Sequence, residues 1–334
     1  MIAESNNFFF HFLSQYFPPV YISHITGIRS AATGKEIEGW FVACPMTAQR
    51  LRRVPVEVAY RKIVQTGRLA ERLGARLLGL GAFTSVVGDA GITVARRLNI
   101  PVTTGISYTV AIAVEAVREA ARRVGLPLNE ARAAVVGATG AVGSVCARLL
   151  ARDVAQIILI GRRASRLEEI RSLVEEEGEA SVVVSTAIED IGDADLIISA
   201  TSAVKPIIKP HHLKAGAVVY DIAVPRDVSP EVQARQDVLV IDGGMVVVPG
   251  DVDFGFDFGF PPGMAYACMA ETMILALEGR YECYTLGRDV QLERVDEIAR
   301  LGKKHGFQLG GFRSFGRVVS EAQIERVREY AQAI

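Results

Sequence analysis

Ala133-Ala-Val-Val-Gly-Ala-Thr-Gly-Ala-Val-Gly-Ser144, followed by Ile157-Ile-Leu-Ile-Gly-Arg-Arg163, decides the fold of this chain of 334 residues. An apolar run typical of a buried strand leads into glycines at every third position, then a helical pattern, then a second apolar strand. Gly137 would permit a tight turn, Gly140 a close approach to a pyrophosphate, and Gly143 close packing of the helix on the strand. The pattern predicts a dinucleotide-binding loop, with cofactor contacts at Gly137, Thr139, Gly140, Ala141, Val142 and Gly143.

The end of the second strand indicates which dinucleotide binds. An NAD site usually carries Asp or Glu there, to bond the ribose hydroxyl groups, whereas this chain has Arg162 and Arg163. Guanidinium groups are suited to a 2′-phosphate. We therefore predict NADP(H) as the cofactor, with both arginines in contact with it.

Four more apolar runs follow at intervals filled by polar or helical spacers: 181–185, 195–201, 217–223 and 238–244. This alternation predicts a Rossmann-like, doubly wound parallel sheet, and so an α/β fold. Ligands bind at the carboxyl ends of such strands, which adds the predicted cofactor contacts Thr201, Ser202, Ala203, Asp221, Gly243 and Gly244. For Asp221 an equal alternative is that it only bonds the neighbouring backbone.

Composition excludes several classes of protein. Hydrophobic residues make up 50% and charged residues 22%, as in an ordinary globular enzyme. The net charge of −1 gives no support to a nucleic-acid-binding protein driven by whole-chain charge, and the sequence predicts no such partner. Four cysteines without metal-binding spacing indicate a reducing, cytoplasmic location and no metal site.

Membrane insertion is not expected, because no run of about 18 apolar residues occurs. The N-terminal Phe8-Phe-Phe-His-Phe-Leu13 lacks a basic leader, so it does not resemble a signal peptide. We favour packing of these phenylalanines under the first domain over contact with lipid, and peripheral membrane contact stays an open alternative.

Three segments are predicted from the changes of pattern along the chain: residues 1–128, 129–249 and 250–334. The first is an N-terminal α/β lobe for substrate and catalysis, with a β-hairpin over 20–44 and helices over 55–73 and 108–124. The second is the NADP-binding domain. The third is a C-terminal helical segment, with helices over 264–281, 290–305 and 320–333, which we expect to return to the cleft between the lobes.

This third segment carries a candidate nucleophile. Pro261 and Pro262 predict a helix start, which puts Cys268 in the early turns, where the helix dipole favours a thiolate. Glu271, three residues later, shares its face, and both are predicted catalytic residues. A thiolate near a nicotinamide could hold an acyl group as a thioester for reduction to an aldehyde. From local sequence alone, a small buried apolar role for Cys268 is the simpler interpretation.

Motifs along residues 22–307 resemble those of the cyanobacterial-type long-chain acyl-[acyl-carrier-protein] reductases. They are Ala32-Thr-Gly-Lys35, Leu80-Gly-Ala-Phe-Thr-Ser85, Thr103-Thr-Gly105, Val135-Val-Gly-Ala-Thr-Gly140, Asp242-Gly-Gly244, Ala267-Cys-Met-Ala-Glu271, Leu286-Gly-Arg288 and His305-Gly-Phe307. The resemblance implies NADPH-dependent conversion of fatty acyl thioesters, on acyl-carrier protein or coenzyme A, to fatty aldehydes. In that family the cysteine matching Cys268 carries the acyl group.

Two departures concern the expected substrate pocket. The chain has Gly105-Ile-Ser-Tyr-Thr109 where the family usually has Gly-Asn-Thr-His-Thr, and Asp221-Ile-Ala-Val-Pro225 in place of Asp-Gly-Gly-Tyr-Pro. Acyl length and acyl donor therefore do not follow from the resemblance. The residues predicted to line the pocket are Phe83, Thr84, Ser85, Gly105 and Tyr108.

Other candidate functional residues each have a functional and a structural interpretation. Cys44 is either a second thiol at the site or a core residue. His305 either donates a hydrogen bond to an oxyanion or the carrier, or is a partner of the helix C-terminus. The phenylalanines at 254, 256, 258 and 260 line an acyl tunnel or pack in a core. A basic stretch either binds an acidic acyl-carrier protein or forms a solvated helix face. Its members are Arg50, Arg52, Arg53, Arg61 and Lys62.

Two other functions remain as alternatives. A shikimate-type NADP-dependent alcohol dehydrogenase has a similar order of lobes, but it needs a lysine and aspartate pair in the first lobe. Lys35 and Lys62 are the only lysines before the glycine loop, and neither ends a strand. The third alternative is a non-catalytic NADP-binding sensor or scaffold. The sequence does not indicate an oligomeric state.

Overall fold

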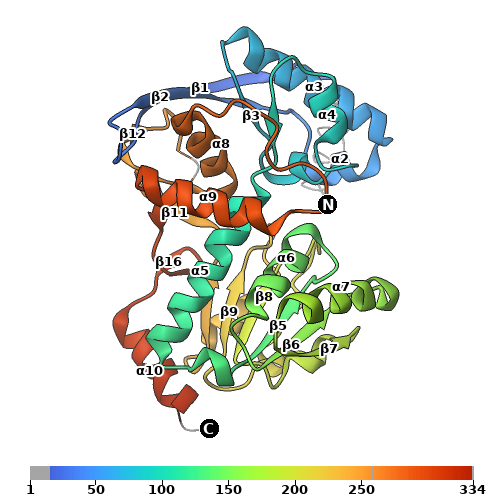
Figure 1. Cartoon of the computed structure of the whole chain (residues 1–334), viewed down its shortest axis with the longest axis vertical. Coiled ribbons are helices and arrows are strands. Elements are labelled where there is room, and N and C mark those ends of the chain that lie inside the picture. Colours follow the sequence, from blue (N-terminus) through green and yellow to red (C-terminus); the bar gives the residue numbers. More distant parts are fainter. Residues whose placement is uncertain (1–15, 258, 333–334) are drawn as a thin grey trace, which may run out of the picture. The chain divides into compact units, whose positions relative to one another are not determined.

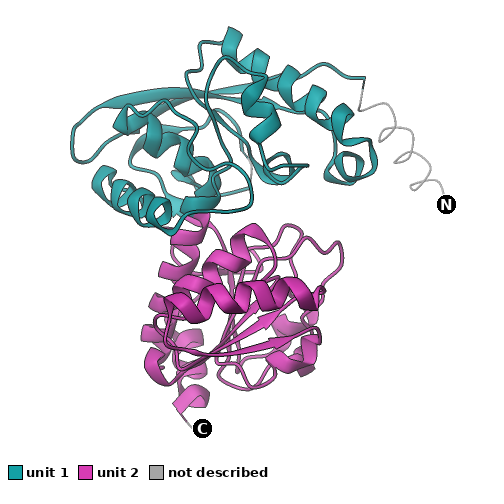
Figure 2. Ribbon diagram, turned by 45° about the vertical axis from the view of Figure 1, so that its right-hand side comes forward, with its two compact units in different colours: residues 1–108, 246–308 teal, residues 109–245, 309–334 magenta. Residues whose placement is uncertain are grey.

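The computed structural model describes residues 16–257 and 259–332. These residues form two compact units, drawn in different colours in Figure 2. Unit 1 contains the described chain up to Tyr108 together with residues 246–308. Unit 2 contains residues 109–245 and the described chain from Leu309 onward.

The division of the chain differs from the predicted boundaries after residues 128 and 249. Helix α5 (Ile106–Val124) begins in unit 1 and belongs to unit 2 from Thr109 onward. Val110, Val117 and Val124 in this part of the helix are almost completely buried, as expected for the apolar face of an amphipathic helix. The predicted C-terminal segment is shared as well, since the units change again after residue 308.

Unit 2 is built on one six-stranded sheet with the order β10-β9-β8-β5-β6-β7, and every neighbouring pair is parallel. Its strands are β5 (Arg132–Val136), β6 (Gln156–Ile160), β7 (Ser181–Ser185), β8 (Leu196–Ser199), β9 (Val218–Asp221) and β10 (Leu239–Asp242). Numbered along the chain, this order is 3-2-1-4-5-6, the Rossmann order. The predicted fold class and all six predicted strands are confirmed.

The sheet of unit 2 is covered by helices, so its inner strands are apolar on both sides. Leu196, Ile197 and Ile198 of β8 are fully buried. Figure 1 shows α6 (Ala141–Leu150) and α7 (Ala164–Glu177) packed along the strands. The remaining elements are the hairpin β15 (Arg313–Ser314) and β16 (Arg317–Val318), helix α10 (Glu321–Gln332), and the short helices η2 (Leu128–Glu130), η3 (Ile188–Ile191), η4 (Pro210–His212) and η5 (Pro230–Ala234).

Unit 1 contains the predicted hairpin, formed by β1 (Val20–Arg29) and β2 (Glu36–Ala43). Strand β12 (Gly250–Asp253) pairs with the other edge of β1. The hairpin is followed by α2 (Ala48–Arg53), α3 (Val56–Arg72), β3 (Leu78–Gly79), η1 (Ala82–Ser85), α4 (Ile92–Arg96) and β4 (Val102–Thr103). The C-terminal part of the chain adds α8 (Ala267–Glu278) and α9 (Leu292–His305), and a small sheet has the order β13 (Met264–Tyr266), β11 (Met245–Val247), β14 (Gln308–Leu309). Helix α8 contacts β2, β3 and α9.

Helix α8 starts later than predicted. Pro261 and Pro262 precede strand β13, which pairs with β11, and the helix begins only at Ala267. The two prolines and a turn at Gly263, which has φ +79°, are therefore followed by a strand rather than by a helix. Pairing with a distant strand outweighs the local helix signal here. Cys268 nevertheless lies in the first turn of its helix, as predicted.

Phe8 to Leu13 lie outside the described residues, as does Phe258. Within the described part of the chain, no helix has the length and apolar character needed to cross a membrane.

Candidate active site

The turn after β5 and the first turn of α6 each contain a glycine that has no room for a side chain. Gly137 has φ +90°, and a Cβ on it would lie 2.6 Å from the carbonyl oxygen of Ala200. A Cβ on Gly143 would lie 2.3 Å from the carbonyl oxygen of Gly137. Helix α6 begins directly after Gly140, so the N–H groups of its first turn have no acceptor within the helix. These residues fit a dinucleotide, because the backbone can approach a pyrophosphate and its N–H groups can bind the charge.

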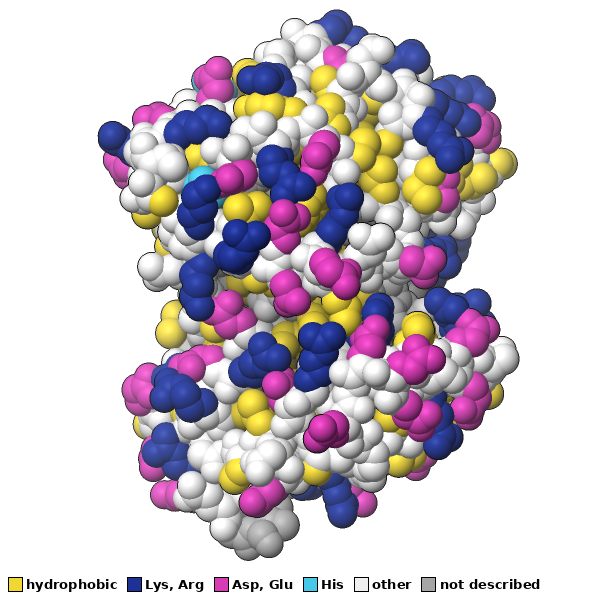
Figure 3. Space-filling model, in the orientation of Figure 1, with side chains coloured by type: hydrophobic (Ala, Val, Ile, Leu, Met, Phe, Trp, Pro, Cys, Tyr) yellow, Lys and Arg dark blue, Asp and Glu magenta, His cyan; other side chains and the backbone are white. Residues whose placement is uncertain are grey.

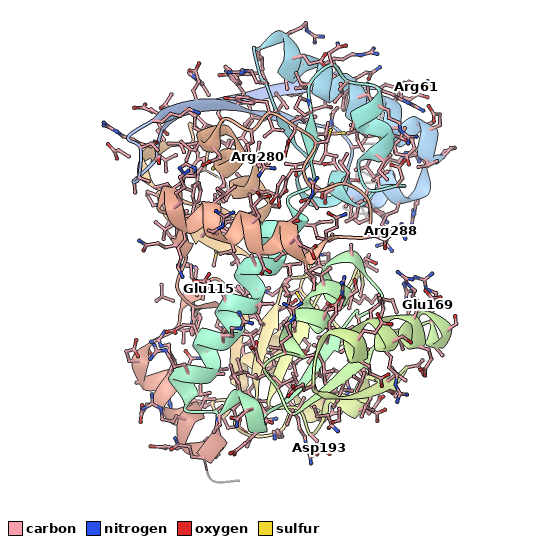
Figure 4. All side chains as sticks on the ribbon, in the orientation of Figure 1. Arg61, Glu115, Glu169, Asp193, Arg280 and Arg288 are labelled. Atoms are coloured by element: carbon pink, nitrogen blue, oxygen red, sulfur yellow. The ribbon has the colours of Figure 1, made fainter. Side chains whose placement is uncertain are left out.

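Two arginines without an acidic partner follow β6. Arg162 and Arg163 are exposed, and neither forms an ion pair with another described residue. Arg166, one turn further on, is paired with Glu169, a residue labelled in Figure 4. The charge of the first two arginines is therefore available to an anionic ligand at the carboxyl end of this strand.

The loop after β8 is held by a buried carboxylate that sequence reasoning missed. Asp227 is completely buried and accepts hydrogen bonds from Ser199 Oγ (2.7 Å), the N–H of Thr201 (3.0 Å) and Thr201 Oγ1 (2.5 Å). Thr201 Oγ1 accepts in turn from the N–H of Ala203 (3.0 Å). Asp227 thus fixes the predicted contacts 201–203. No local pattern marks it, because its partners lie 26 and 28 residues earlier.

Hydrogen bonds to neighbouring groups hold Asp221, Gly243 and Gly244 in place. Burial raises the pKa of Asp221 to about 7. Its carboxylate accepts hydrogen bonds at 2.9–3.0 Å from the N–H groups of Ala223, Asp227 and Val228. The N–H of Gly243 donates to the Asp221 carbonyl (2.7 Å), and that of Gly244 to Tyr220 Oη (2.8 Å). Of the two interpretations of Asp221, the structure shows the bonding to neighbouring backbone; its contact with a cofactor stays a prediction.

In unit 1, three segments meet at Cys268, the second residue of α8. A Cβ on Gly105, which has φ +75°, would lie 2.4 Å from Cys268 Cα and 2.5 Å from its Cβ, so only glycine fits the turn after β4. The N–H of Ala82 in η1 donates a hydrogen bond to the sulfur. Ala82 is a non-glycine residue with φ +48°, an unfavourable backbone conformation that packing must maintain. The thiol therefore has a fixed environment and is only partly exposed.

The expected thiolate is not the resting form of Cys268. Burial raises the pKa of its thiol to about 11. The negative charge of Glu271 raises the pKa further, and backbone hydrogen bonds, among them that from Ala82, lower it. Desolvation outweighs the favourable helix terminus, because a thiolate loses its hydration in this site.

We expect alkylation of Cys268 by iodoacetamide to accelerate about tenfold per pH unit from pH 7 to pH 10, because only the thiolate reacts and its fraction grows in that proportion below the pKa. The rate is measured by mass spectrometry of the peptide that contains Cys268. The peptide that contains the exposed Cys283 is followed in the same samples as an internal reference for reagent access. A rate that levels off near pH 8 would contradict this prediction.

Glu271 is completely buried one turn after Cys268. Its carboxylate accepts hydrogen bonds from the hydroxyl group of Thr103 and the N–H of Tyr108 (2.9 Å). The N–H of Gly105 and the hydroxyl group of Thr285 also bond it. Burial raises the pKa of Glu271 above its ordinary value. The carboxylate therefore joins α8 to the turn between β4 and α5.

The predicted pocket residues lie in the same part of unit 1. Thr84 Oγ1 donates to the carbonyl of Gly81 and Ser85 Oγ to that of Ala82, both at 2.7 Å, so these hydroxyl groups stabilise the η1 turn. Phe83 packs against the apolar core of the unit. Tyr108 is buried edge-on against Phe307, with ring centroids 6.3 Å apart. Contact with an acyl chain stays a prediction for all five residues.

Cys44 and His305 have internal partners. Cys44 packs against the apolar core of unit 1, and burial raises the pKa of its thiol. His305 is the last residue of α9, before Gly306 with φ +96°. Its ring nitrogens share hydrogen bonds of 2.8 Å with Ser30 Oγ and Glu278 Oε2. These contacts agree with the structural interpretation of both residues.

The basic stretch is not one continuous surface. Lys62 is buried, and its Nζ donates to the carbonyl of Phe17 (2.8 Å). Arg52, Arg53 and Arg61 are exposed on α2 and α3, and Figure 4 labels Arg61. In Figure 3, Lys and Arg side chains are interspersed with Asp and Glu over the visible face. The prediction of Lys62 as part of a docking face is therefore wrong, because its stem is inside the core.

The phenylalanines after β12 differ in their surroundings. Phe254 is buried, and its ring stacks on Phe41 with centroids 6.0 Å apart. Phe256 is 52% exposed, and Phe260 packs on Tyr266. A common role in lining an acyl tunnel stays a prediction.

Comparison with known proteins gives matches of different extent. The family model described as shikimate / quinate 5-dehydrogenase matches residues 118–242, from within α5 to the end of β10. Long-chain acyl-[acyl-carrier-protein] reductase of Synechococcus elongatus is 29% identical over 306 residues, which cover 87% of each chain. Aminotransferase PigE of a Serratia species is 32% identical over 306 residues, 90% of this chain. Glutamyl-tRNA reductase of Pseudomonas aeruginosa is 31% identical over 131 residues, 35% of this chain.

This chain spans only 36% of the length of aminotransferase PigE, and the matched part of glutamyl-tRNA reductase is 29% of that protein. Two of these relatives are reductases by name. Together with the sheet order and the glycine loop, they support an NAD(P)-dependent oxidoreductase.

Proposed function

We propose that this chain reduces long-chain fatty acyl thioesters, on acyl-carrier protein or coenzyme A, to fatty aldehydes with NADPH, through a thioester on Cys268. The observation that carries the proposal is the environment of Cys268, a thiol at a helix start with the Gly105 backbone against it and the Ala82 N–H on its sulfur. The similarity to the Synechococcus elongatus enzyme over 87% of both chains supports the substrate class.

In the first step the Cys268 sulfur attacks the acyl carbon of the incoming thioester. The bond from the acyl carbon to the donor sulfur breaks, and the proton of Cys268 ends on the departing thiol. The Ala82 N–H and the first-turn N–H groups of α8 can stabilise the negative charge that develops on the carbonyl oxygen. Because the resting thiol is protonated, acylation includes a proton transfer.

In the second step the acyl group on Cys268 is reduced. NADPH, when bound, supplies the hydride that adds to the thioester carbon. The carbon–sulfur bond then breaks, the aldehyde leaves, and one proton from solvent restores the Cys268 thiol. The glycine loop would hold the pyrophosphate, with Arg162 and Arg163 on the 2′-phosphate.

Trapping the intermediate tests the proposal directly. We expect the protein incubated with palmitoyl-carrier protein, without NADPH, to gain the mass of one palmitoyl group on the peptide that contains Cys268, because the reduction cannot follow. Addition of NADPH should remove the adduct and release one equivalent of hexadecanal. The measurement is intact-protein and peptide mass spectrometry with gas chromatography of the aldehyde.

NADPH binding without any adduct on Cys268 would contradict the proposal and favour a non-catalytic NADP-binding protein. Palmitoyl-coenzyme A in a parallel incubation distinguishes the two acyl donors. The same peptide map reports on Cys44, Cys146 and Cys283, which serve as internal controls.

The alternative of a shikimate-type alcohol dehydrogenase is supported by the match over residues 118–242, which lies within unit 2. That activity needs a lysine in the first lobe to handle the alcohol proton. Lys35 Nζ donates hydrogen bonds of 2.9–3.0 Å to the carbonyls of Ala276 and Leu277 at the end of α8. Lys62 is buried, and its Nζ donates a hydrogen bond to the carbonyl of Phe17. Both lysines are engaged in structural hydrogen bonds, so we favour the acyl thioester reductase.

A further inference from the structure

Glu271 gathers hydrogen-bond donors from distant parts of unit 1. The hydroxyl group of Thr103 and the N–H of Tyr108 belong to residues 168 and 163 positions away along the chain. The other two donors are the N–H of Gly105 and the hydroxyl group of Thr285. A carboxylate offers about four lone-pair sites, and four donors occupy them. Because these hydrogen bonds favour the ionised carboxylate, a proton from Cys268 would have to displace one of the four donors.

A second layer of hydrogen bonds supports these donors. Thr103 Oγ1 accepts from the N–H of Thr285 (3.1 Å), and the N–H of Thr104 donates to the Thr285 carbonyl (3.0 Å). The hydroxyl groups of Ser107 and Thr285 share a bond of 2.8 Å. The turn after β4 is thus fixed from two sides, with Glu271 in the centre.

The same turn forms the surface on which Cys268 is packed. Gly105 donates to Glu271 and also lies against Cys268, where a Cβ on the glycine would be 2.4–2.5 Å from the cysteine backbone and Cβ. Cys268 and Glu271 are three residues apart on α8. The distance between the helix and the turn is therefore set by the carboxylate.

We propose that Glu271 is a positioning residue, which holds the turn from Thr103 to Tyr108 against α8 and thereby fixes Cys268, and that it does not take the thiol proton. The assignment replaces the catalytic role predicted for Glu271 from the sequence. It rests on the proposed function only for its turnover measurements, because the reactivity of Cys268 with a small reagent needs neither substrate nor cofactor.

Two variants separate positioning from proton transfer. Glu271→Gln removes the negative charge that raises the pKa of the Cys268 thiol, so the midpoint of the pH dependence of iodoacetamide alkylation should fall. Turnover should fall about tenfold to a hundredfold at the same time, because the nucleophile is misplaced. Thr103→Val removes one donor and keeps the charge. It should lower turnover about tenfold without lowering the alkylation midpoint.

Thr103→Ser is the matched control, because it keeps the hydroxyl group, and it should recover most of the turnover lost in Thr103→Val. Far-ultraviolet circular dichroism and NADPH binding check that each variant is folded. If Glu271→Gln does not fold, the difference in turnover between Thr103→Val and Thr103→Ser tests the proposal alone.

The proposal is overturned if alkylation becomes slower in Glu271→Gln, since a base that activates the thiol would have been removed. It is also overturned if Thr103→Val turns over at the rate of Thr103→Ser. Failure of the proposed function has a different signature: Cys268→Ala would keep its activity, whereas the alkylation results for Glu271 would stand by themselves.

Discussion

Aldehyde formation from a long-chain acyl thioester and NADPH is expected to fall by a factor of about a thousand or more when Cys268 is replaced by alanine. The reason is that the sulfur forms and releases the acyl bond in both steps, and no backbone group can replace it. Substitution removes one partly exposed sulfur from the start of α8, so we expect little loss of stability. Gas chromatography of the aldehyde and the loss of NADPH absorbance measure the rate.

Cys283→Ser is the matched control for this experiment. Cys283 is exposed, and the N–H of Val102 donates a hydrogen bond of 3.5 Å to its sulfur. Its loss should leave aldehyde formation unchanged. If Cys268→Ala and Cys283→Ser form aldehyde at the same rate, the acyl group is not carried by Cys268 and the proposed function has to be abandoned.

The second large effect concerns the choice of cofactor. We expect the double variant Arg162→Ala/Arg163→Ala to bind NADPH about a hundredfold more weakly, because each charged hydrogen bond to a phosphate is worth about 1.5–3 kcal/mol. Binding of NADH should change less than threefold, since it has no 2′-phosphate. Titration of the intrinsic fluorescence of the reduced cofactor gives both dissociation constants.

Arg166→Ala is the control for charge alone. Arg166 lies on the same helix, α7, but its guanidinium group is paired with Glu169. Its removal should alter NADPH affinity by less than about threefold, as expected for a paired surface charge. Equal affinity of the unaltered protein for NADH and NADPH would contradict the assignment of Arg162 and Arg163 to the 2′-phosphate.

The fold of unit 2 could be read from the sequence because its signals are local. Apolar runs of strand length, a helical pattern between them and the glycines at 137, 140 and 143 each lie within a short window. The structure explains why the glycine positions are informative: a side chain at Gly143 would collide with the Gly137 carbonyl. Strand order then follows from the right-handed connection of parallel strands.

The environment of the thiol could be predicted only in part. The position of Cys268 at a helix start is visible in the sequence, yet burial raises the pKa of its thiol to about 11, whereas the helix dipole alone suggests a lower value. The same holds for Lys62, which looks like part of a basic surface and is buried against the Phe17 carbonyl. Burial depends on which distant segments cover a side chain, and no window around the residue contains that information.

The nucleotide-binding fold, the glycine loop, the arginine pair and the helix that begins near Cys268 can all be predicted from the amino-acid sequence, because turns, periodicity and charge at a strand end are properties of neighbouring residues. The partners of Asp227 and Glu271, the starting residue of α8 and the division of the chain into units depend instead on contacts between distant segments. A buried carboxylate must be satisfied by whatever donors the fold brings to it, and for Glu271 these lie up to 168 residues away.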